Sequence, residues 1–411
     1  MKDLFPPAYR LLFRQRDFRL FWTGFTLSVI GDAMSHVALT WYVWETTHSP
    51  QALGLLTFFY TGPVVVGGLF AGILLDRFGP RRVMIIDSLL RGAAFGLIPL
   101  LHFTGALRIW HIYTIAGVYG GLMMISLAGS PTMIPSLISE DLLPAANALE
   151  TIAFTLGGVV GPPIAGALIG LIGVPNVILA DVMSYFAFAA LLWRVQGGAR
   201  ETARSDGGRE PVRLSTAIKL LIGNRILLST TAMYLSANVG LGMMSVWLPV
   251  KVDEMGGKAG IYGAFLGAIA GGEVTSSVLA GTLRAGIPLG LLIGLAQIAS
   301  GLSVAGVLLG NRAWIVALSL VLLGFFSAPL TIWAQTLRMR IVPPELRGRT
   351  FALLRTLMQG GNPVGGLLGG AFLPAAGVSG AIAVSAALVG LPGAVGLRVR
   401  ELREAGGESH T

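Results

Sequence analysis

Ionisable side chains interrupt several long apolar stretches of the sequence. In LSVIGDAMSHVALTWYVW, residues 27–44, Asp32 lies near the middle and His36 follows four residues later. This spacing puts the carboxyl and the imidazole on one face of a helix, within reach of each other. An acid in such a place can load and release a proton, and a neighbouring histidine can tune it. Glu273, surrounded by small residues in AIAGGEVTSSVLAG, offers a second protonatable carboxyl.

Arg91 is a further candidate for proton coupling. It follows Asp87 by four residues, so the two can form an ion pair along one helix. A charge inside a bilayer costs about 2.5–3.5 kcal/mol on insertion scales, which makes each such residue a functional hypothesis. Structural roles are the alternative, and we expect them for Asp87 and for Asp181. For Asp32 and His36, hydrogen bonding to neighbouring helices stays open as the plainer explanation.

The elements that carry these residues are membrane helices. Charged residues make up 12% of the chain and hydrophobic residues 54%, whereas about 25% is the charged share usual for soluble domains. A soluble fold of 411 residues could not hide this much apolar side chain, so lipid must surround most of it. The absence of cysteine excludes disulfides and thiolate metal sites. No metal motif or phosphate-binding loop occurs, so we expect neither a metal nor a cofactor.

Apolar runs of about 20 residues predict twelve transmembrane helices. The predicted spans are 18–45, 51–75, 83–102, 109–138, 142–170, 174–195, 225–250, 259–284, 287–310, 313–341, 349–373 and 377–398. Their sequence divides into two related halves, because residues 140–167 align with residues 344–371. Two pseudo-symmetric six-helix halves are the architecture of alternating-access transporters, although a membrane enzyme could also be duplicated.

This repeat predicts four parts of the chain. They are a first six-helix half at 1–195, a cytoplasmic linker with a short amphipathic helix at 196–224, a second half at 225–398 and a cytoplasmic tail at 399–411. The basic N-terminal segment leads into a run too long for a signal peptide, and we expect it to be retained.

The placement of the basic residues predicts the orientation. Of the 29 Lys and Arg residues, only Arg108, Lys251, Lys258 and Arg312 fall in loops on the side opposite the termini. Because basic loops stay inside, both termini are predicted to be cytoplasmic, in the inner membrane of a bacterium. The formal net charge of +9 is thus explained by topology, and no nucleic-acid partner is expected.

The turn between the second and third spans, GILLDRFGPRR, resembles the signature of the major facilitator superfamily. The matching residues are Gly72, Asp76, Arg77, Gly79, Arg81 and Arg82. Pro80 departs from the signature, since the family usually has a basic residue there. The resemblance implies an all-helical major facilitator fold and gives this turn the role of a latch between the halves. A plain basic turn at the inner leaflet is the alternative.

The fifth span, with GGVVGPPIAGALIG, looks like the motif of exporters and antiporters in the same superfamily. The matching residues are Gly157, Gly161, Pro162, Ala165 and Gly166. Glycines four residues apart leave a smooth helix face for close contact, and the proline removes a backbone hydrogen bond. The motif implies antiport-type export, and a packing face without directional meaning is the alternative.

In this superfamily the first, fourth, seventh and tenth spans line a central cavity, which suggests residues for substrate contact. These candidates, with two at the bend of the eleventh span, are Tyr119, Met123, Asn238, Trp333, Gln335, Gln359 and Asn362. Membrane helices also use such residues for packing, so each is a weak candidate alone.

Looser similarity over nearly the whole chain is to the enterobactin exporters and macrolide efflux proteins. We therefore expect a monomeric, proton-coupled antiporter that expels amphipathic drug-like or siderophore-like molecules, and no enzyme. The alternatives are a lysophospholipid flippase or a metabolite uniporter or symporter, and, from another class, a membrane scaffold or enzyme. A catalytic domain would need loops longer than those predicted here.

Overall fold

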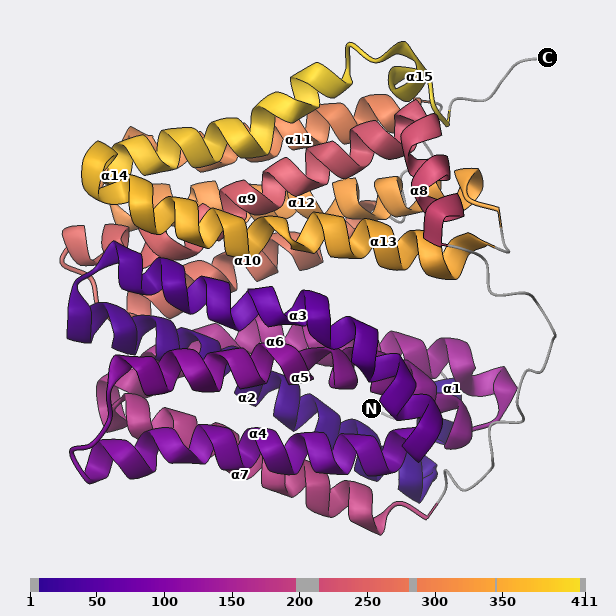
Figure 1. Ribbon diagram of the computed structural model, residues 1–411, viewed down its shortest axis with the longest axis vertical. Helices are drawn as coiled ribbons and strands as arrows, with labels where there is room; N and C mark the ends of the chain where they lie inside the picture. Colours follow the sequence, from indigo (N-terminus) through magenta and orange to yellow (C-terminus); the bar gives the residue numbers. More distant parts are fainter. Residues whose placement is uncertain (1–6, 197–213, 281–286, 344–345, 407–411) are drawn as a thin grey trace. The chain divides into compact units, whose positions relative to one another are not determined.

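The computed structural model describes residues 7–196, 214–280, 287–343 and 346–406, and Figure 1 shows their arrangement. These residues form helices and the turns between them, with no strand in the described ranges. Residues 197–213 of the predicted linker and 407–411 of the predicted tail lie outside this description.

The chain divides into two compact units. The first consists of Met1–Val43, Phe59–Gly207 and Lys258–Gly263, and the second of Trp44–Phe58, Gly208–Gly257 and Ala264–Thr411. This division describes the packing of the chain, while the four parts expected from the sequence remain a prediction.

The first unit contains α1 and α4–α7 with most of α2 and α3. Their bounds are α1 (Pro7–Arg14), α2 (Arg16–Thr47), α3 (Pro50–Phe78), α4 (Pro80–Phe103), α5 (Ile109–Met133), α6 (Leu143–Ile172) and α7 (Val174–Arg194). Within this unit α4 packs against α5 and α7, as Figure 1 also shows. Phe21, Phe25 and Phe188 form part of an apolar core that α1, α2, α4, α6 and α7 share.

The second unit contains α8, α9 and α11–α15 with most of α10. Their bounds are α8 (Leu214–Gly223), α9 (Arg225–Glu254), α10 (Ala259–Ala280), α11 (Leu289–Gly306), α12 (Ala313–Ile341), α13 (Arg347–Gln359), α14 (Gly361–Gly396) and α15 (Arg400–Arg403). Helix α14 packs against α9 and α11, and α11 packs against α12. Asn224 caps α9, because its side chain accepts hydrogen bonds from the backbone N–H groups of Ile226 and Leu227.

Nine segments of the described chain are long and apolar enough to cross a membrane. One of them, Thr350–Gly396, is 47 residues long and breaks at Gly377, whose positive φ of 68° ends one helix and starts the next. Helices α2 and α10 are not among the nine; in α2, charged and polar residues dilute the apolar stretch. With these two helices and the division at Gly377, each of the twelve predicted spans corresponds to a helical segment over its described residues, and residues 281–284 of the eighth span lie outside the description.

Candidate functional site

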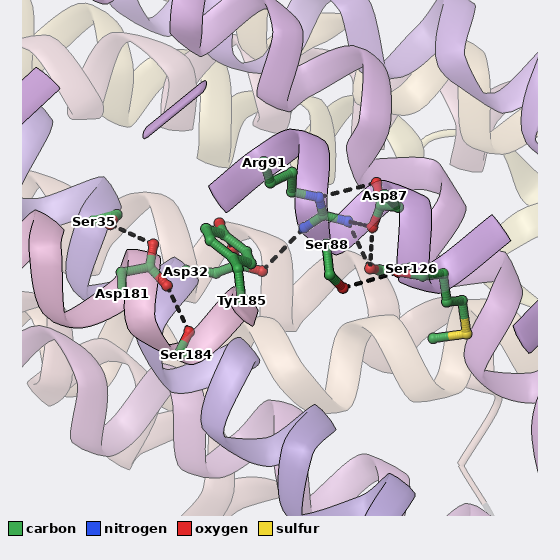
Figure 2. Close-up of polar contacts among 10 residues, drawn as sticks. Asp32, Ser35, Asp87, Ser88, Arg91, Ser126, Asp181, Ser184 and Tyr185 are labelled. Atoms are coloured by element: carbon green, nitrogen blue, oxygen red, sulfur yellow. Dashed lines mark hydrogen bonds and ion pairs between the residues drawn. The ribbon is translucent and has the colours of Figure 1, made fainter. Parts of the chain in front are cut away.

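Helices α2 and α7 meet closely in the first unit because residue 31 has no side chain. A Cβ atom on Gly31 would collide with Oδ1 of Asp181 and with Oγ of Ser184, both on α7. This close approach puts Asp32 and Ser35 of α2 beside one face of α7. Figure 2 shows the polar groups that gather there.

Asp32 accepts a hydrogen bond from the hydroxyl of Tyr185 on α7. Its Oδ2 also lies 3.5 Å from Nη1 of Arg91 on α4. The Asp32 side chain keeps 21% of its surface exposed, whereas that of Arg91 keeps 2%. Asp32 is therefore the open member of a buried polar cluster.

Arg91 forms its closest ion pair with Asp87, one turn earlier on α4. Its Nη2 lies 2.6 Å from Asp87 Oδ2 and its Nε lies 3.1 Å from Asp87 Oδ1, so the contact is bidentate. Ser126 on α5 accepts from Arg91 Nη2 at 2.6 Å and donates to Asp87 Oδ2 at 3.1 Å. The predicted i, i+4 pair therefore exists, but inside the unit and joined to Asp32.

Asp181 on α7 is as buried as Asp87, at 1% exposure. Its carboxylate accepts hydrogen bonds from Ser35 of α2 and from Ser184 one turn away on α7. Hydrogen bonds thus run in both directions between α2 and α7. Ser35 of α2 donates to Asp181 of α7, and Tyr185 of α7 donates to Asp32 of α2. Figure 2 shows Ser35 and Ser184 on either side of the Asp181 carboxylate and the contact between Asp32 and Arg91.

Aromatic rings surround the cluster. The guanidinium carbon of Arg91 lies 5.4 Å from the ring centroid of Tyr119 and 5.8 Å from that of Tyr185. Such contacts favour a cation in a dry setting. Tyr119, a predicted cavity residue, is itself buried and lies 4.5 Å, centroid to centroid, from Tyr60.

His36 does not pair with Asp32 in the described structure. Its imidazole lies 4.9 Å, centroid to centroid, from the ring of Tyr60, while Asp32 binds Tyr185 and Arg91. Asp32 is already bound by the guanidinium of Arg91 and the phenol of Tyr185. The pair with His36 that the helical spacing allows is therefore not formed.

Glu273 belongs to α10 of the second unit, and its side chain is exposed. The hydrogen bonds at this residue go to its backbone carbonyl, which accepts from the hydroxyls of Ser276 and Ser277. The structure gives Glu273 neither the burial nor the partners of Asp32.

The glycines of the exporter motif lie against the part of α2 that carries Asp32. A Cβ on Gly157 would stand 2.6 Å from Val29 Cγ1, and one on Gly161 would stand 2.7 Å from Ala33 Cβ. Both distances are too short, so α6 and α2 approach with backbone contact. Among the other motif residues, Pro162 and Ala165 are buried in α6, and a Cβ on Gly166 would stand 2.5 Å from the backbone oxygen of Ala259.

The signature turn joins α3 to α4. Gly79 adopts a positive φ of 80° and Pro80 starts α4 at its first position, where its missing N–H costs nothing. Arg81 donates to the carbonyl oxygens of Leu192 at 3.0 Å and Trp193 at 2.6 Å, at the C-terminal end of α7. Asp76 is exposed, and the described residues form no recorded hydrogen bond or ion pair with its carboxylate.

The remaining signature residues make few contacts. The guanidinium carbon of Arg77 lies 5.3 Å from the ring centroid of Phe78. No heavy atom lies within 4 Å of where a Cβ on Gly72 would stand, and Arg82 is exposed. The turn is therefore tied to its own unit through Arg81.

Two of the predicted substrate residues of the second unit meet. Asn362 on α14 donates through Nδ2 to Oδ1 of Asn238 on α9 at 3.2 Å, and Asn238 donates to the carbonyl of Tyr234 at 3.0 Å. Of the other candidates, Trp333 is half-buried and Gln335 exposed on α12, and Gln359 is half-buried at the end of α13. In the first unit, Met123 is half-buried on α5.

The transmembrane secretion effector family matches residues 11–409 of this sequence. The chain belongs to this family of major facilitator transporters. The assignment confirms the resemblance found in the signature turn and makes the protein a transporter, not an enzyme. It also confirms the all-helical major facilitator fold, in a multi-pass membrane protein.

Proteins similar to this chain include transporters of different compounds. The multidrug efflux pump Tap of Mycobacterium tuberculosis is 24% identical over 92% of this chain and 92% of its own length. The staphyloferrin A transporter of Staphylococcus aureus is 23% identical over 85% of this chain and 88% of its own length. The crystal structure of a point mutant of the nucleoside transporter NupG matches with a TM-score of 0.73 at 13% identity, over 92% of this chain and 99% of that one.

The buried cluster also contains residues outside the predicted site. The sequence predicts a structural role for Asp181 and none for Ser35, Ser126 or Tyr185. A signal was present, because Asp181, Ser184 and Tyr185 share one helical face in ILADVMSYFAF. That face is polar inside an apolar span, which predicts a polar partner on a neighbouring helix.

Proposed function

We propose that this protein is a proton-coupled exporter of amphipathic small molecules, drug-like or siderophore-like, that works by alternating access. The relatives support the substrate class, because one is named a multidrug efflux pump and another a siderophore transporter. The exporter motif at Gly157–Gly166 supports the direction of transport.

The observation that supports proton coupling is the charge balance of the buried cluster around Arg91. In the described part of the first unit, the cluster has three carboxyls, those of Asp32, Asp87 and Asp181, but one guanidinium, that of Arg91, which contacts the first two. An uncompensated charge is costly in a membrane interior, where groups shed it by taking up or losing a proton. Protons are therefore the coupling ion that this site favours.

Asp32 is the residue that we assign to the coupling step. It is partly exposed, so a proton can reach it, and its ion pair with Arg91 is the looser of the two at 3.5 Å. When ionised, Asp32 attracts the guanidinium; when protonated, it releases Arg91 to Asp87. Such a change in helix contacts can bias one conformation of the transporter over another.

The orientation and organisation follow the same proposal. We place both termini in the cytoplasm, on the evidence of the basic loops, and treat the protein as a monomer of two six-helix halves in a bacterial inner membrane. Because the chain has no cysteine, single substitutions can test the orientation directly. Thr104→Cys should react with an impermeant maleimide from outside the cell and Ser139→Cys should not, whereas the reverse result would invert the topology.

The transport test uses proteoliposomes loaded with an acidic lumen and the fluorescent cation ethidium outside. The wild-type protein should accumulate the dye, and an ionophore that collapses the proton gradient should abolish the accumulation. Asp32→Asn should fall to the level of protein-free vesicles. Glu273→Gln tests whether the exposed acid of the second unit contributes.

The matched control is Asp141→Asn, because this acid lies in an exposed turn of the same unit. It should transport like the wild type. Full gradient-driven uptake by Asp32→Asn would contradict the role of Asp32. Uptake by the wild type that ignores the gradient would contradict proton coupling as a whole.

A further inference from the structure

Asp181 has no role in a coupling step that uses Asp32 alone, yet it is deeply buried. At 1% exposure it is shielded from bulk water, and its hydrogen-bond partners in the described chain are the hydroxyls of Ser35 and Ser184. No Lys, Arg or His of the described chain forms an ion pair with it. Its charge is therefore uncompensated by direct contact.

The partners of the two buried acids differ in what they allow. A guanidinium can only donate hydrogen bonds, so the bidentate contact with Arg91 requires Asp87 to be ionised. A serine hydroxyl can donate or accept. Ser35 and Ser184 therefore suit Asp181 in both states: they donate to the carboxylate, and one of them accepts when the acid carries a proton.

The charged and titratable groups near Asp181 are one acid, one cation and several aromatic rings. On α2 the neighbour is the acid Asp32, whose charge repels a second negative charge, and on α7 it is Tyr185. On α4 the cation Arg91 is already engaged with Asp87. Tyr119 of α5 and Tyr60 of α3 are phenols, which remain neutral in ordinary conditions, and His36 of α2 contacts Tyr60.

We propose that Asp181 is a second protonation site, distinct from Asp32, and that the cluster binds two protons when it is electrically neutral. With the Asp87–Arg91 pair neutral in itself, Asp32 and Asp181 each contribute one negative charge that a proton removes. The protonation of Asp181 stands on this geometry alone. Its use in transport rests on the proposed function.

The site is built so that the two acids exchange protons differently. Asp32 is partly open and can equilibrate with a water-filled pathway, whereas Asp181 is closed by Gly31 and Ser35 of α2. Asp181 therefore holds its proton until α2 and α7 separate. Two protons then move for each cycle, and export of an uncharged molecule carries net charge across the membrane.

Infrared spectroscopy of the full chain in phospholipid nanodiscs tests the protonation directly. The wild-type protein at neutral pH should show the C=O stretching band of a buried protonated carboxylic acid. Asp181→Asn should lose this band, and Ser35→Ala and Ser184→Ala should shift its frequency without removing it. Asp87→Asn should leave it in place, because Asp87 is ionised.

The two serine variants keep the test decisive if Asp181→Asn does not fold, because each removes one hydroxyl and keeps the acid. An unchanged band in Asp181→Asn, or no shift in either serine variant, would overturn the proposal. A wild-type spectrum without any protonated carboxyl band would overturn it as well.

A second measurement separates this proposal from the proposed function. The proton-to-ethidium ratio in proteoliposomes, found from the membrane potential that just balances an imposed pH gradient, should fall by one proton in Asp181→Asn. An unchanged ratio in a gradient-driven variant would remove Asp181 from the cycle and leave coupling through Asp32 intact. Loss of all gradient dependence in the wild type would instead refute the proposed function.

Discussion

The guanidinium of Arg91 lies between two carboxylates at unequal distances. Its Nη2 is 2.6 Å from Oδ2 of Asp87, and its Nη1 is 3.5 Å from Oδ2 of Asp32. The tight pair is the local one on α4, and the loose pair reaches across to α2. Arg91 is therefore anchored by Asp87 and available to Asp32.

Removal of the arginine should destabilise the protein strongly. Arg91→Gln leaves the buried Asp87 without its cation, and breaking a buried ion pair costs about 3–5 kcal/mol. The midpoint of thermal unfolding in detergent should fall clearly. Asp87→Asn combined with Arg91→Gln should recover much of the lost stability, because no charge is then left unpaired at that contact. Equal stability of the single and double variants would show that the pair does not act as a unit.

A methyl group at Gly161 should disturb the position of Asp32. The new Cβ would stand 2.7 Å from that of Ala33, so α6 must push α2 away. Gly161→Ala should lower both gradient-driven ethidium uptake and the unfolding midpoint.

The matched control on the same helix is Gly170→Ala, where no heavy atom lies within 4 Å of the added Cβ. This variant should keep transport and gain stability of up to about 1 kcal/mol from helix propensity. If the two alanine variants behave alike, close contact between α2 and α6 is unimportant.

The asparagine pair of the second unit should show a small coupling energy. The hydrogen bond between Asn362 and Asn238 is 3.2 Å long, and interhelical hydrogen bonds in membranes average about 0.6 kcal/mol. A double-mutant cycle with Asn238→Ala and Asn362→Ala, read from unfolding midpoints, should give a value of that size. If the destabilisation by the two single substitutions simply adds in the double variant, the hydrogen bond contributes nothing. A change in the relative uptake of several dyes by either variant would indicate a role in substrate contact as well.

Arg81 of the signature turn between α3 and α4 should contribute more to stability than its neighbour Arg82. Arg81 binds two carbonyl oxygens at the end of α7, whereas Arg82 is exposed. Arg81→Gln should lower stability by about 1 kcal/mol, because hydrogen bonds from a charged donor are lost at a partly exposed site. Arg82→Gln should leave the unfolding midpoint unchanged, and a reversed order would mean that Arg81 does not hold α4 to α7.

The helices of this protein were predictable because lipid imposes a simple rule on sequence. A span needs about 20 apolar residues, so predicted and observed bounds agree closely, as for residues 313–341 and Ala313–Ile341. The bend expected near Gln359 and Asn362 appears as the break between α13 and α14. Pro80 lay outside the family signature, and the structure explains it as the first residue of α4.

The partners within the candidate site were harder to predict, because helical spacing constrains one helix at a time. It indicated Asp87 with Arg91, which are bonded, and Asp32 with His36, which are not. Contacts of Asp32 with Tyr185, and of Ser35 with Asp181, join residues about 150 positions apart. Such contacts depend on how α2 and α7 are rotated and how closely Gly31 lets them approach, which the pattern of a single helix does not contain.

The two reciprocal hydrogen bonds between α2 and α7 link the charge of the acids to the packing of the helices. Each acid is served by the opposite helix, through Tyr185 in one direction and Ser35 in the other. A proton bound at either carboxyl would therefore change a hydrogen bond between the two helices. If the two acids take up protons as we propose, the contact between α2 and α7 changes with their charge.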